Sequence, residues 1–312
     1  MMSARTTGSP HASSASPGSA AAQASPALAA FFAAYDEALS RWPVPAEALT
    51  VRTPHGATRV NACGPRDGRP LVLLHGGGAT STGWFANVGA LTAAGHRILA
   101  VDLIGDPGRS VLDVPLGGVA GLMSWLDAVL DGLGVAGVDL CGHSYGGWIA
   151  LEYALHAPER VHRLALLDPT QCFAGFRPGY LLRALPLFVP PRTAGKARSY
   201  LTWEARGAGS GTTDEAAWRE LYALGFTGFP ATRPVTGPQP TTERLRALTA
   251  PTLALFAARS RTHDARRVAE LARKALPGAT VDVLPDASHH NLPIAHPAEL
   301  NRRLTEFLAA RP

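Results

Sequence analysis

The segment Gly142-His143-Ser144-Tyr145-Gly146 places a serine at the centre of a G-x-S-x-G pentad. An apolar run leads directly into this pentad and a helical pattern leads directly out of it. A strand-to-helix turn this tight leaves no room for side chains two positions on either side of its apex. Gly142 and Gly146 therefore admit the turn, and we expect Ser144 to be held in a strained, exposed conformation that suits a nucleophile.

A serine hydroxyl is a poor nucleophile near neutral pH, so a base must accept its proton and a carboxylate must orient that base. Two adjacent histidines, His289 and His290, follow the last predicted strand. Counting forward from that strand favours His289, whereas counting back from His296 and the final helix favours His290. We take His290 as the base and keep His289 as the alternative.

The carboxylate that should orient the histidine does not stand at its usual place in the chain. An aspartate commonly follows the strand that we predict over residues 251 to 257, but Arg259, Ser260 and Arg261 stand there instead. Asp168 ends the preceding strand and reaches the same histidine if the acid has moved one strand across the sheet. Asp264 lies further along and also has the position of a helix N-cap. We favour Asp168 as the acid and keep Asp264 as the alternative.

Backbone amides for an oxyanion hole are expected from two places. The segment His75-Gly76-Gly77-Gly78 directly follows a predicted strand, and its glycines let a loop amide approach closely. The amide of Tyr145 follows the serine. We predict Gly77 as the first donor, with Gly78 as the next choice. A phosphate-binding loop is excluded because no Lys-Ser/Thr pair follows the glycines.

These residues need a scaffold that brings separate strand ends together. From residue 70 onward, short apolar runs alternate with helical patterns, which is typical of a mostly parallel sheet with helices on both faces. The sequence therefore predicts an α/β fold entered by an antiparallel hairpin over residues 49 to 63. The further predicted strands are 71–74, 97–101, 137–141, 161–167, 251–257 and 280–284, and the helices are 26–42, 118–133, 145–156, 264–276 and 297–309.

One stretch interrupts this alternation. Residues 169 to 249 separate two predicted strands by far more than a crossover needs, and they hold ten of the 22 aromatic residues. We predict a helical cap here whose rings line an apolar pocket or pack the cap onto the body. The α/β core then comprises residues 26–168 and 250–312, and residues 1–25, rich in Ala, Ser, Pro and Gly, form a disordered leader.

Composition limits the remaining possibilities. The 312 residues carry a net charge of +5 that is scattered along the chain, which argues against a nucleic-acid partner. Three widely spaced cysteines, Cys63, Cys141 and Cys172, indicate neither a disulfide framework nor a metal site, and they favour a reducing compartment. No segment has the length of a membrane span. We expect a cytoplasmic protein without metal or cofactor that acts on a small molecule.

The glycine run after His75, the segment from Asp102 to Ser110, the serine pentad and the His289/His290 segment together resemble the α/β-hydrolase superfamily. The similarity extends over about residues 48 to 311. It points to the branch of capped small esterases, haloperoxidase-like enzymes and C–C hydrolases. The resemblance implies a helical cap between the sixth and seventh strands of that family. Some dehalogenases of this fold carry their acid after the sixth strand, which supports Asp168.

The resulting hypothesis is a serine hydrolase that cleaves a carboxylic ester, thioester or lactone of a mainly apolar, small to medium substrate through an acyl-enzyme. Two alternatives stay open. One is a biosynthetic tailoring enzyme, such as a cyclase or C–C bond hydrolase, and the other is a non-catalytic ligand-binding protein on the same scaffold. The missing acid after the strand at 251–257 motivates the second. The oligomeric state and the physiological substrate do not follow from the sequence.

Overall fold

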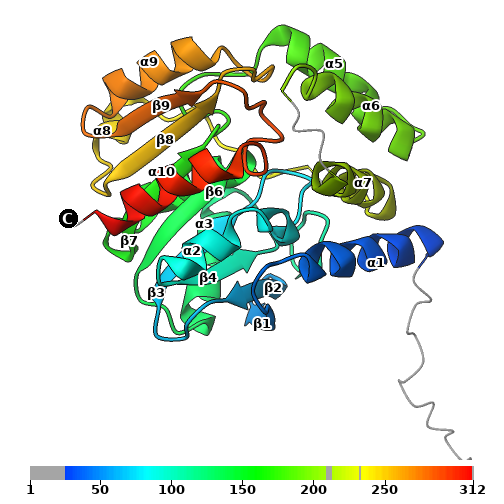
Figure 1. The fold of residues 1–312 in the computed structure, drawn as a ribbon, viewed down its shortest axis with the longest axis horizontal. Helices are drawn as coiled ribbons and strands as arrows, with labels where there is room; N and C mark the ends of the chain where they lie inside the picture. The colour runs from blue at the N-terminus through cyan, green and yellow to red at the C-terminus, as the bar shows by residue number, and fades with distance from the viewer. Residues whose placement is uncertain (1–24, 209–212, 232, 311–312) are drawn as a thin grey trace, which may run out of the picture.

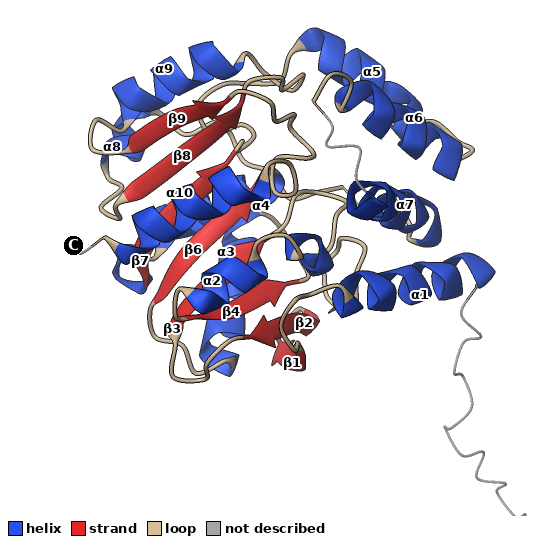
Figure 2. Ribbon diagram, in the orientation of Figure 1, coloured by secondary structure: helices blue, strands red, loops and turns tan. Residues whose placement is uncertain are grey.

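A single twisted sheet forms the centre of the computed structural model, which describes residues 25–208, 213–231 and 233–310 (Figures 1 and 2). Its strands follow the order β1-β2-β4-β3-β6-β7-β8-β9, and the short strand β5 pairs with β2. From β4 to β9 every neighbouring pair is parallel, whereas β1, β2 and β5 pair antiparallel. The predicted α/β class and its mostly parallel sheet are confirmed.

The strands agree with the predicted apolar runs to within two residues at most ends. Their bounds are β1 Glu47–Thr53, β2 Gly56–Cys63, β3 Arg69–Leu74, β4 His96–Val101, β5 Val111–Leu112, β6 Val138–His143, β7 Val161–Leu167, β8 Thr252–Ala257 and β9 Thr280–Leu284. Sequence analysis did not predict β5, because a two-residue strand has no periodicity to detect.

Helices cover both faces of the sheet, as Figure 2 shows. Alternate residues of β3 illustrate this: Val72 and Leu74 pack toward the face with α3, α4 and α9, whereas Leu71 and Leu73 pack toward α2 and α10. The helices of the body are α1 Pro26–Ser40, α2 Val88–Ala93, α3 Val119–Gly132, α4 Tyr145–His156, α8 Thr242–Arg246, α9 Ala265–Ala275 and α10 Pro297–Ala309, with short 3-10 helices at Ser81–Trp84 and Pro158–Arg160. Sequence analysis missed α2 and α8, which are short.

Three helices between β7 and β8 lie beyond the carboxyl ends of the strands (Figure 1). They are α5 Pro178–Phe188, α6 Ala194–Glu204 and α7 Thr213–Gly228, and we call them the cap helices. Helix α8 falls in the predicted cap range, but it packs on the body, where Leu245 joins the same core as α9. The proposed leader, residues 1–25, lies outside the described residues except for Ser25, which caps α1. No helix among the described residues is long and apolar enough to cross a membrane.

Candidate active site

The turn between β6 and α4 holds Ser144 at φ 54°, in the left-handed region that non-glycine residues seldom adopt. Two neighbouring glycines make this turn possible. A Cβ at Gly142 would lie 2.2 Å from the carbonyl oxygen of Gly146, and a Cβ at Gly146 would lie 2.4 Å from that of Leu74. Any side chain at either position would therefore displace backbone. Ser144 is also the N-cap residue of α4, and the free backbone amides at a helix N-terminus favour a negative charge nearby.

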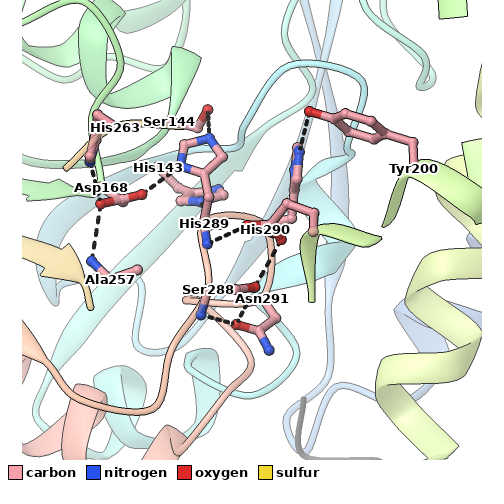
Figure 3. A network of polar contacts seen from close by, with 11 residues as sticks. His143, Ser144, Asp168, Tyr200, Ala257, His263, Ser288, His289, His290 and Asn291 are labelled. Atoms are coloured by element: carbon pink, nitrogen blue, oxygen red, sulfur yellow. Dashed lines mark hydrogen bonds and ion pairs between the residues drawn. The ribbon is translucent and has the colours of Figure 1, made fainter. Parts of the chain in front are cut away.

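Three side chains from separate segments form one chain of hydrogen bonds, shown in Figure 3. The hydroxyl Oγ of Ser144 lies 2.8 Å from Nε2 of His289, and Nδ1 of His289 lies 2.6 Å from Oδ2 of Asp168. All three residues are buried. With His289 neutral, the serine donates to Nε2 while Nδ1–H donates to the carboxylate. This is the geometry in which a histidine removes the serine proton and an aspartate orients the histidine.

Asp168 directly follows β7 and is bound from three sides. Its Oδ1 accepts from the amide of Ala257 at 3.0 Å and from Nε2 of His263 at 2.9 Å. Burial alone would raise the pKa of Asp168, but the charge and hydrogen bond of His263 and the hydrogen bond of His289 outweigh burial and hold that pKa well below its ordinary value. Asp168 is therefore an anion at the pH values where a histidine base works.

The other predicted base occupies a different position. The ring of His290 faces the cap, with Nε2 3.4 Å from the Tyr200 hydroxyl and its ring edge-on to those of Tyr200 and Tyr222. Burial lowers the pKa of His290 well below the ordinary value, so its ring is neutral. The structure thus corrects the preference for His290. Counting back from α10 fails because the loop between β9 and α10 folds on itself, with the Asn291 side chain accepting from the Ser288 amide at 2.8 Å.

Asp264, the alternative acid, is engaged elsewhere. Its Oδ1 accepts from the amide of Arg267 at 3.1 Å, which makes it the N-cap of α9, and its Oδ2 lies 3.2 Å from the Arg177 guanidinium. The hydrogen bond from the Arg267 amide is the main cause that lowers the pKa of Asp264. The carboxylate is half exposed. These contacts give Asp264 the structural role that its position before a helix also indicates.

A cavity of about 390 Å³ opens beside Ser144 between the strand ends and the cap helices. Gly77, Gly78 and Tyr145 line it on the side of the body. The amide of Gly78 donates to Asp106 at 3.2 Å, whereas within the described residues the amides of Gly77 and Tyr145 donate to no acceptor. Of these three residues on the cavity wall, Gly77 and Tyr145 thus have amides without an acceptor in the described part of the chain. Six aromatic residues also line the cavity: Phe176, Tyr180, Phe188, Tyr200, Tyr222 and Phe226.

Comparison with known proteins places this geometry in a family. Residues 71–303 match the model of the alpha/beta hydrolase family. The chain belongs to that family. It is 31% identical to carboxylesterase YbfK of Bacillus subtilis over 289 residues, which cover 89% of this chain and 93% of that protein. The predicted superfamily is therefore confirmed, and the relatives support the predicted class of serine hydrolase.

Solved structures of this hydrolase fold agree with the sequence match. The crystal structure of naproxen esterase from Bacillus subtilis superposes with a TM-score of 0.82 at 28% identity, covering 91% of this chain and 99% of that one. The crystal structure of carboxylesterase CesB from the same organism gives a TM-score of 0.82 at 29% identity with the same coverage.

Sequence reasoning missed three residues of this hydrolase that contact the serine–histidine–aspartate chain. His263 donates to Asp168, His143 lies with Nε2 2.7 Å from the carbonyl oxygen of His289, and Glu204 accepts from the His289 amide at 2.9 Å. Burial, followed by the nearby charge of His289, lowers the pKa of His143 to about 3, so its neutral ring donates to that carbonyl. A signal existed for His263, which stands in the loop where the acid was expected and faces an acid one strand away.

Proposed function

We propose that this protein is a serine carboxylesterase in which Ser144 is the nucleophile, His289 the general base and Asp168 the acid that orients it. The observation that carries the proposal is the continuous path from Ser144 Oγ through His289 to Asp168, with separations of 2.8 and 2.6 Å, at the wall of a cavity. The similarity to carboxylesterases over most of the chain supports the reaction class.

In the first half of the reaction, Ser144 Oγ attacks the ester carbonyl carbon while its proton passes to Nε2 of His289. The imidazolium then gives that proton to the leaving alkoxide, which departs as an alcohol and leaves an acyl-serine. In the second half, His289 takes a proton from water, whose oxygen attacks the acyl carbon. The proton then returns to Ser144 Oγ, and the carboxylic acid is released. Asp168 stabilises the imidazolium in both halves without itself taking the proton.

The oxyanion hole in this proposal consists of the amides of Gly77 and Tyr145. Gly78, the next choice from the sequence, has its amide directed to Asp106 at 3.2 Å and is a weaker candidate. Removing one donor of such a hole typically costs about 3 to 4 kcal/mol of transition-state stabilisation.

The cap helices supply most of the apolar wall, so the favoured substrate carries an apolar acyl or alkyl group of small to medium size. A volume of about 390 Å³ is near the lower end of the range for ligand pockets. Six of the ten aromatic residues between 169 and 249 line the cavity. Of the other four, Trp203 and Trp218 belong to the apolar cluster of the cap, and Phe173 and Phe229 pack onto the body. The cap thus serves both purposes that its composition suggests. A cytoplasmic location stays a prediction.

The test combines p-nitrophenyl esters of increasing acyl length with a fluorophosphonate probe. We expect turnover by the native chain, covalent labelling at Ser144, and loss of both in Ser144→Ala. Ser260→Ala is the matched control, because Ser260 is also buried and its hydroxyl has no hydrogen-bond partner among the described residues. A native chain that neither turns over any ester nor labels would contradict the proposal.

A tailoring or C–C bond hydrolase is the second candidate. A 2-hydroxy-6-oxononadienedioate/2-hydroxy-6-oxononatrienedioate hydrolase of Burkholderia vietnamiensis is 44% identical over 101 residues, which is 31% of this chain. The same serine and histidine would serve that reaction. Product analysis separates the two candidates, because C–C cleavage of a vinylogous diketone releases two carbon fragments and no alcohol.

A further inference from the structure

A buried carboxylate of the cap binds the loop that carries His289. Glu204 is the last residue of α6 and is fully buried. Its Oε1 accepts from the His289 amide at 2.9 Å, and its Oε2 accepts from the Ser288 hydroxyl at 2.8 Å and the His290 amide at 3.2 Å. Three consecutive residues of one loop therefore converge on a single side chain from another part of the fold.

The body holds the same loop from the opposite side. The neutral ring of His143, next to the nucleophile in sequence, donates to the carbonyl oxygen of His289 at 2.7 Å. Both backbone polar groups of His289 are thus bound, the amide by the cap and the carbonyl by the body. The ring of His289 has little freedom to leave Ser144 while both contacts hold.

Helix α6 gains little from this carboxylate. A negative charge in the last turn of a helix lies at the negative end of the helix dipole, which is unfavourable. Burial raises the pKa of Glu204 and is the largest influence on it, although the charge of His289 and the hydrogen bonds from Ser288, His290 and His289 oppose that effect. The stability of α6 therefore does not explain a glutamate at position 204. The hydrogen bonds that Glu204 accepts from the His289 and His290 amides do.

We propose that Glu204 is a positioning residue that holds His289 in register with Ser144, so that the base is set in place by the cap as well as by the body. The inference rests on the proposed esterase function. Glu204 does not contact Ser144 and is not one of the residues that line the cavity, which it reaches only through the backbone amide of His290. Its loss should therefore slow acylation without weakening substrate binding. A misplacement of about 1 Å in such a site costs about 100-fold in rate.

The test is Glu204→Gln, which keeps the shape of the side chain but presents an amide NH₂ where an oxygen accepted a hydrogen bond. We expect kcat for a p-nitrophenyl ester to fall about 10- to 100-fold while KM stays within about twofold. The rate of labelling by the fluorophosphonate should fall by the same factor as kcat, because both depend on His289. Glu204→Asp, which keeps the charge but shortens the reach, should also lose kcat and serves if the glutamine variant does not fold.

Glu152→Gln is the matched control. Glu152 is also a buried glutamate, and it accepts from the guanidinium of Arg244 in α8 at 2.9 and 2.6 Å. We expect its kcat and KM to match the native values within about twofold. Both variants are assayed well below their unfolding temperatures, so that a loss of folded protein does not count as a loss of rate.

The pH profile is a readout that a purely structural role would not move. The titratable groups that act on Glu204 are His289 and, from the cap, Tyr180 and Tyr200. Protonation of Glu204 at acid pH replaces an acceptor oxygen by a hydroxyl, so the acid limb of log kcat/KM should be steeper than one ionisation in the native chain. In Glu204→Gln it should follow the single ionisation of the base.

Each outcome decides the matter. Native-like kcat in Glu204→Gln, an equal loss in Glu152→Gln, or a loss confined to KM would overturn the positioning role while leaving ester hydrolysis intact. A native chain without turnover or labelling would remove the esterase function and this role together.

Discussion

Two fully buried carboxylates hold His289, one from the body and one from the cap, and their surroundings differ in charge. Asp168 at the end of β7 binds the imidazole ring, whereas Glu204 at the end of α6 binds the backbone amide. Burial pushes both pKa values upward. It is outweighed at Asp168, whose pKa lies well below the ordinary value, but it prevails at Glu204, whose pKa is raised.

The difference lies in the donors. Asp168 accepts hydrogen bonds from two imidazoles, His263 and His289, which carry or acquire positive charge. The hydrogen-bond donors to Glu204 are two amides and a hydroxyl, and the charge of His289 acts on Glu204 without a hydrogen bond from the ring. A charged partner offsets the loss of hydration far better than neutral donors do. The body therefore supplies an anion to the ring that would become charged in the proposed reaction. The cap supplies Glu204, which holds the loop of His289 in place by hydrogen bonds. Because its pKa is raised, Glu204 takes up a proton more readily than Asp168 does.

The largest effect should come from removing the anion of the body. In Asp168→Asn the amide cannot stabilise an imidazolium and it favours the wrong tautomer of His289, so we expect kcat to fall about 10⁴-fold. Steady-state kinetics on a p-nitrophenyl ester measures this, with circular dichroism to establish that the variant folds. A loss smaller than that in Glu204→Gln would reverse the ranking of the two carboxylates and remove Asp168 as the acid.

His263 tests why Asp168 stays ionised. Replacing it by Gln keeps a hydrogen-bond donor for Oδ1 of Asp168 but removes the charge of a histidine whose pKa is itself raised: burial alone would lower it, and the charge and hydrogen bond of Asp168 outweigh burial. We expect kcat/KM to fall about tenfold, which is 1.4 kcal/mol of transition-state stabilisation. The pKa of Asp168 should rise, which nuclear magnetic resonance of the carboxyl carbon would detect. An unchanged Asp168 pKa would assign its ionisation to His289 alone.

The two carboxylates also differ in how far sequence could predict them. Asp168 follows a buried strand beside the strand of the nucleophile, and carboxyl ends of neighbouring parallel strands meet at one edge of the sheet, so its position follows from topology. Glu204 lies in a helical insertion whose docking on the body follows from no periodicity. The sequence marks Glu204 in only one way: it is the only acidic residue between Asp168 and Asp214.

The histidines show the same limit at the scale of a single residue. Topology predicts that the loop after β9 reaches the nucleophile, and both candidates stand in it. The choice between them depends on how the loop turns, which is set by side-chain contacts of Asn291, His143 and Glu204 that join distant segments. Strand and helix patterns carry information about local conformation, and such long-range contacts are absent from them.

Stability as a function of pH should separate the two carboxylates by sign. A lowered folded-state pKa contributes stability that is present above the unfolded pKa and lost as pH falls through the folded value, and a raised pKa contributes stability below the unfolded pKa that is lost as pH rises. The stability advantage of the native chain over Asp168→Asn should thus shrink below about pH 4. Relative to Glu204→Gln, the native chain should instead gain stability as pH falls from neutral toward about 4.

Urea unfolding of the native chain, Asp168→Asn and Glu204→Gln across this pH range measures how the free energy of unfolding of each variant differs from the native value. Each unit of pKa shift corresponds to about 1.4 kcal/mol. If the stability differences of Asp168→Asn and Glu204→Gln from the native chain changed with pH in the same direction, Asp168 and Glu204 would have similar environments. That result would contradict the contrast between their hydrogen-bond donors.

The smallest effect should come from Asp264, the acidic residue that the sequence offered as an alternative to Asp168. Asp264→Ala removes the N-cap of α9, where the carboxylate accepts from the Arg267 amide at 3.1 Å, so the free energy of unfolding should fall by about 1 kcal/mol. Because this carboxylate is half exposed and bonded away from His289, kcat and KM should stay at native values. If kcat fell more than about tenfold while the variant remained folded, Asp264 would again be a candidate for the acid. Unchanged kinetics with reduced stability would leave Asp168 as the acid of the proposed reaction, with Asp264 serving only to cap α9.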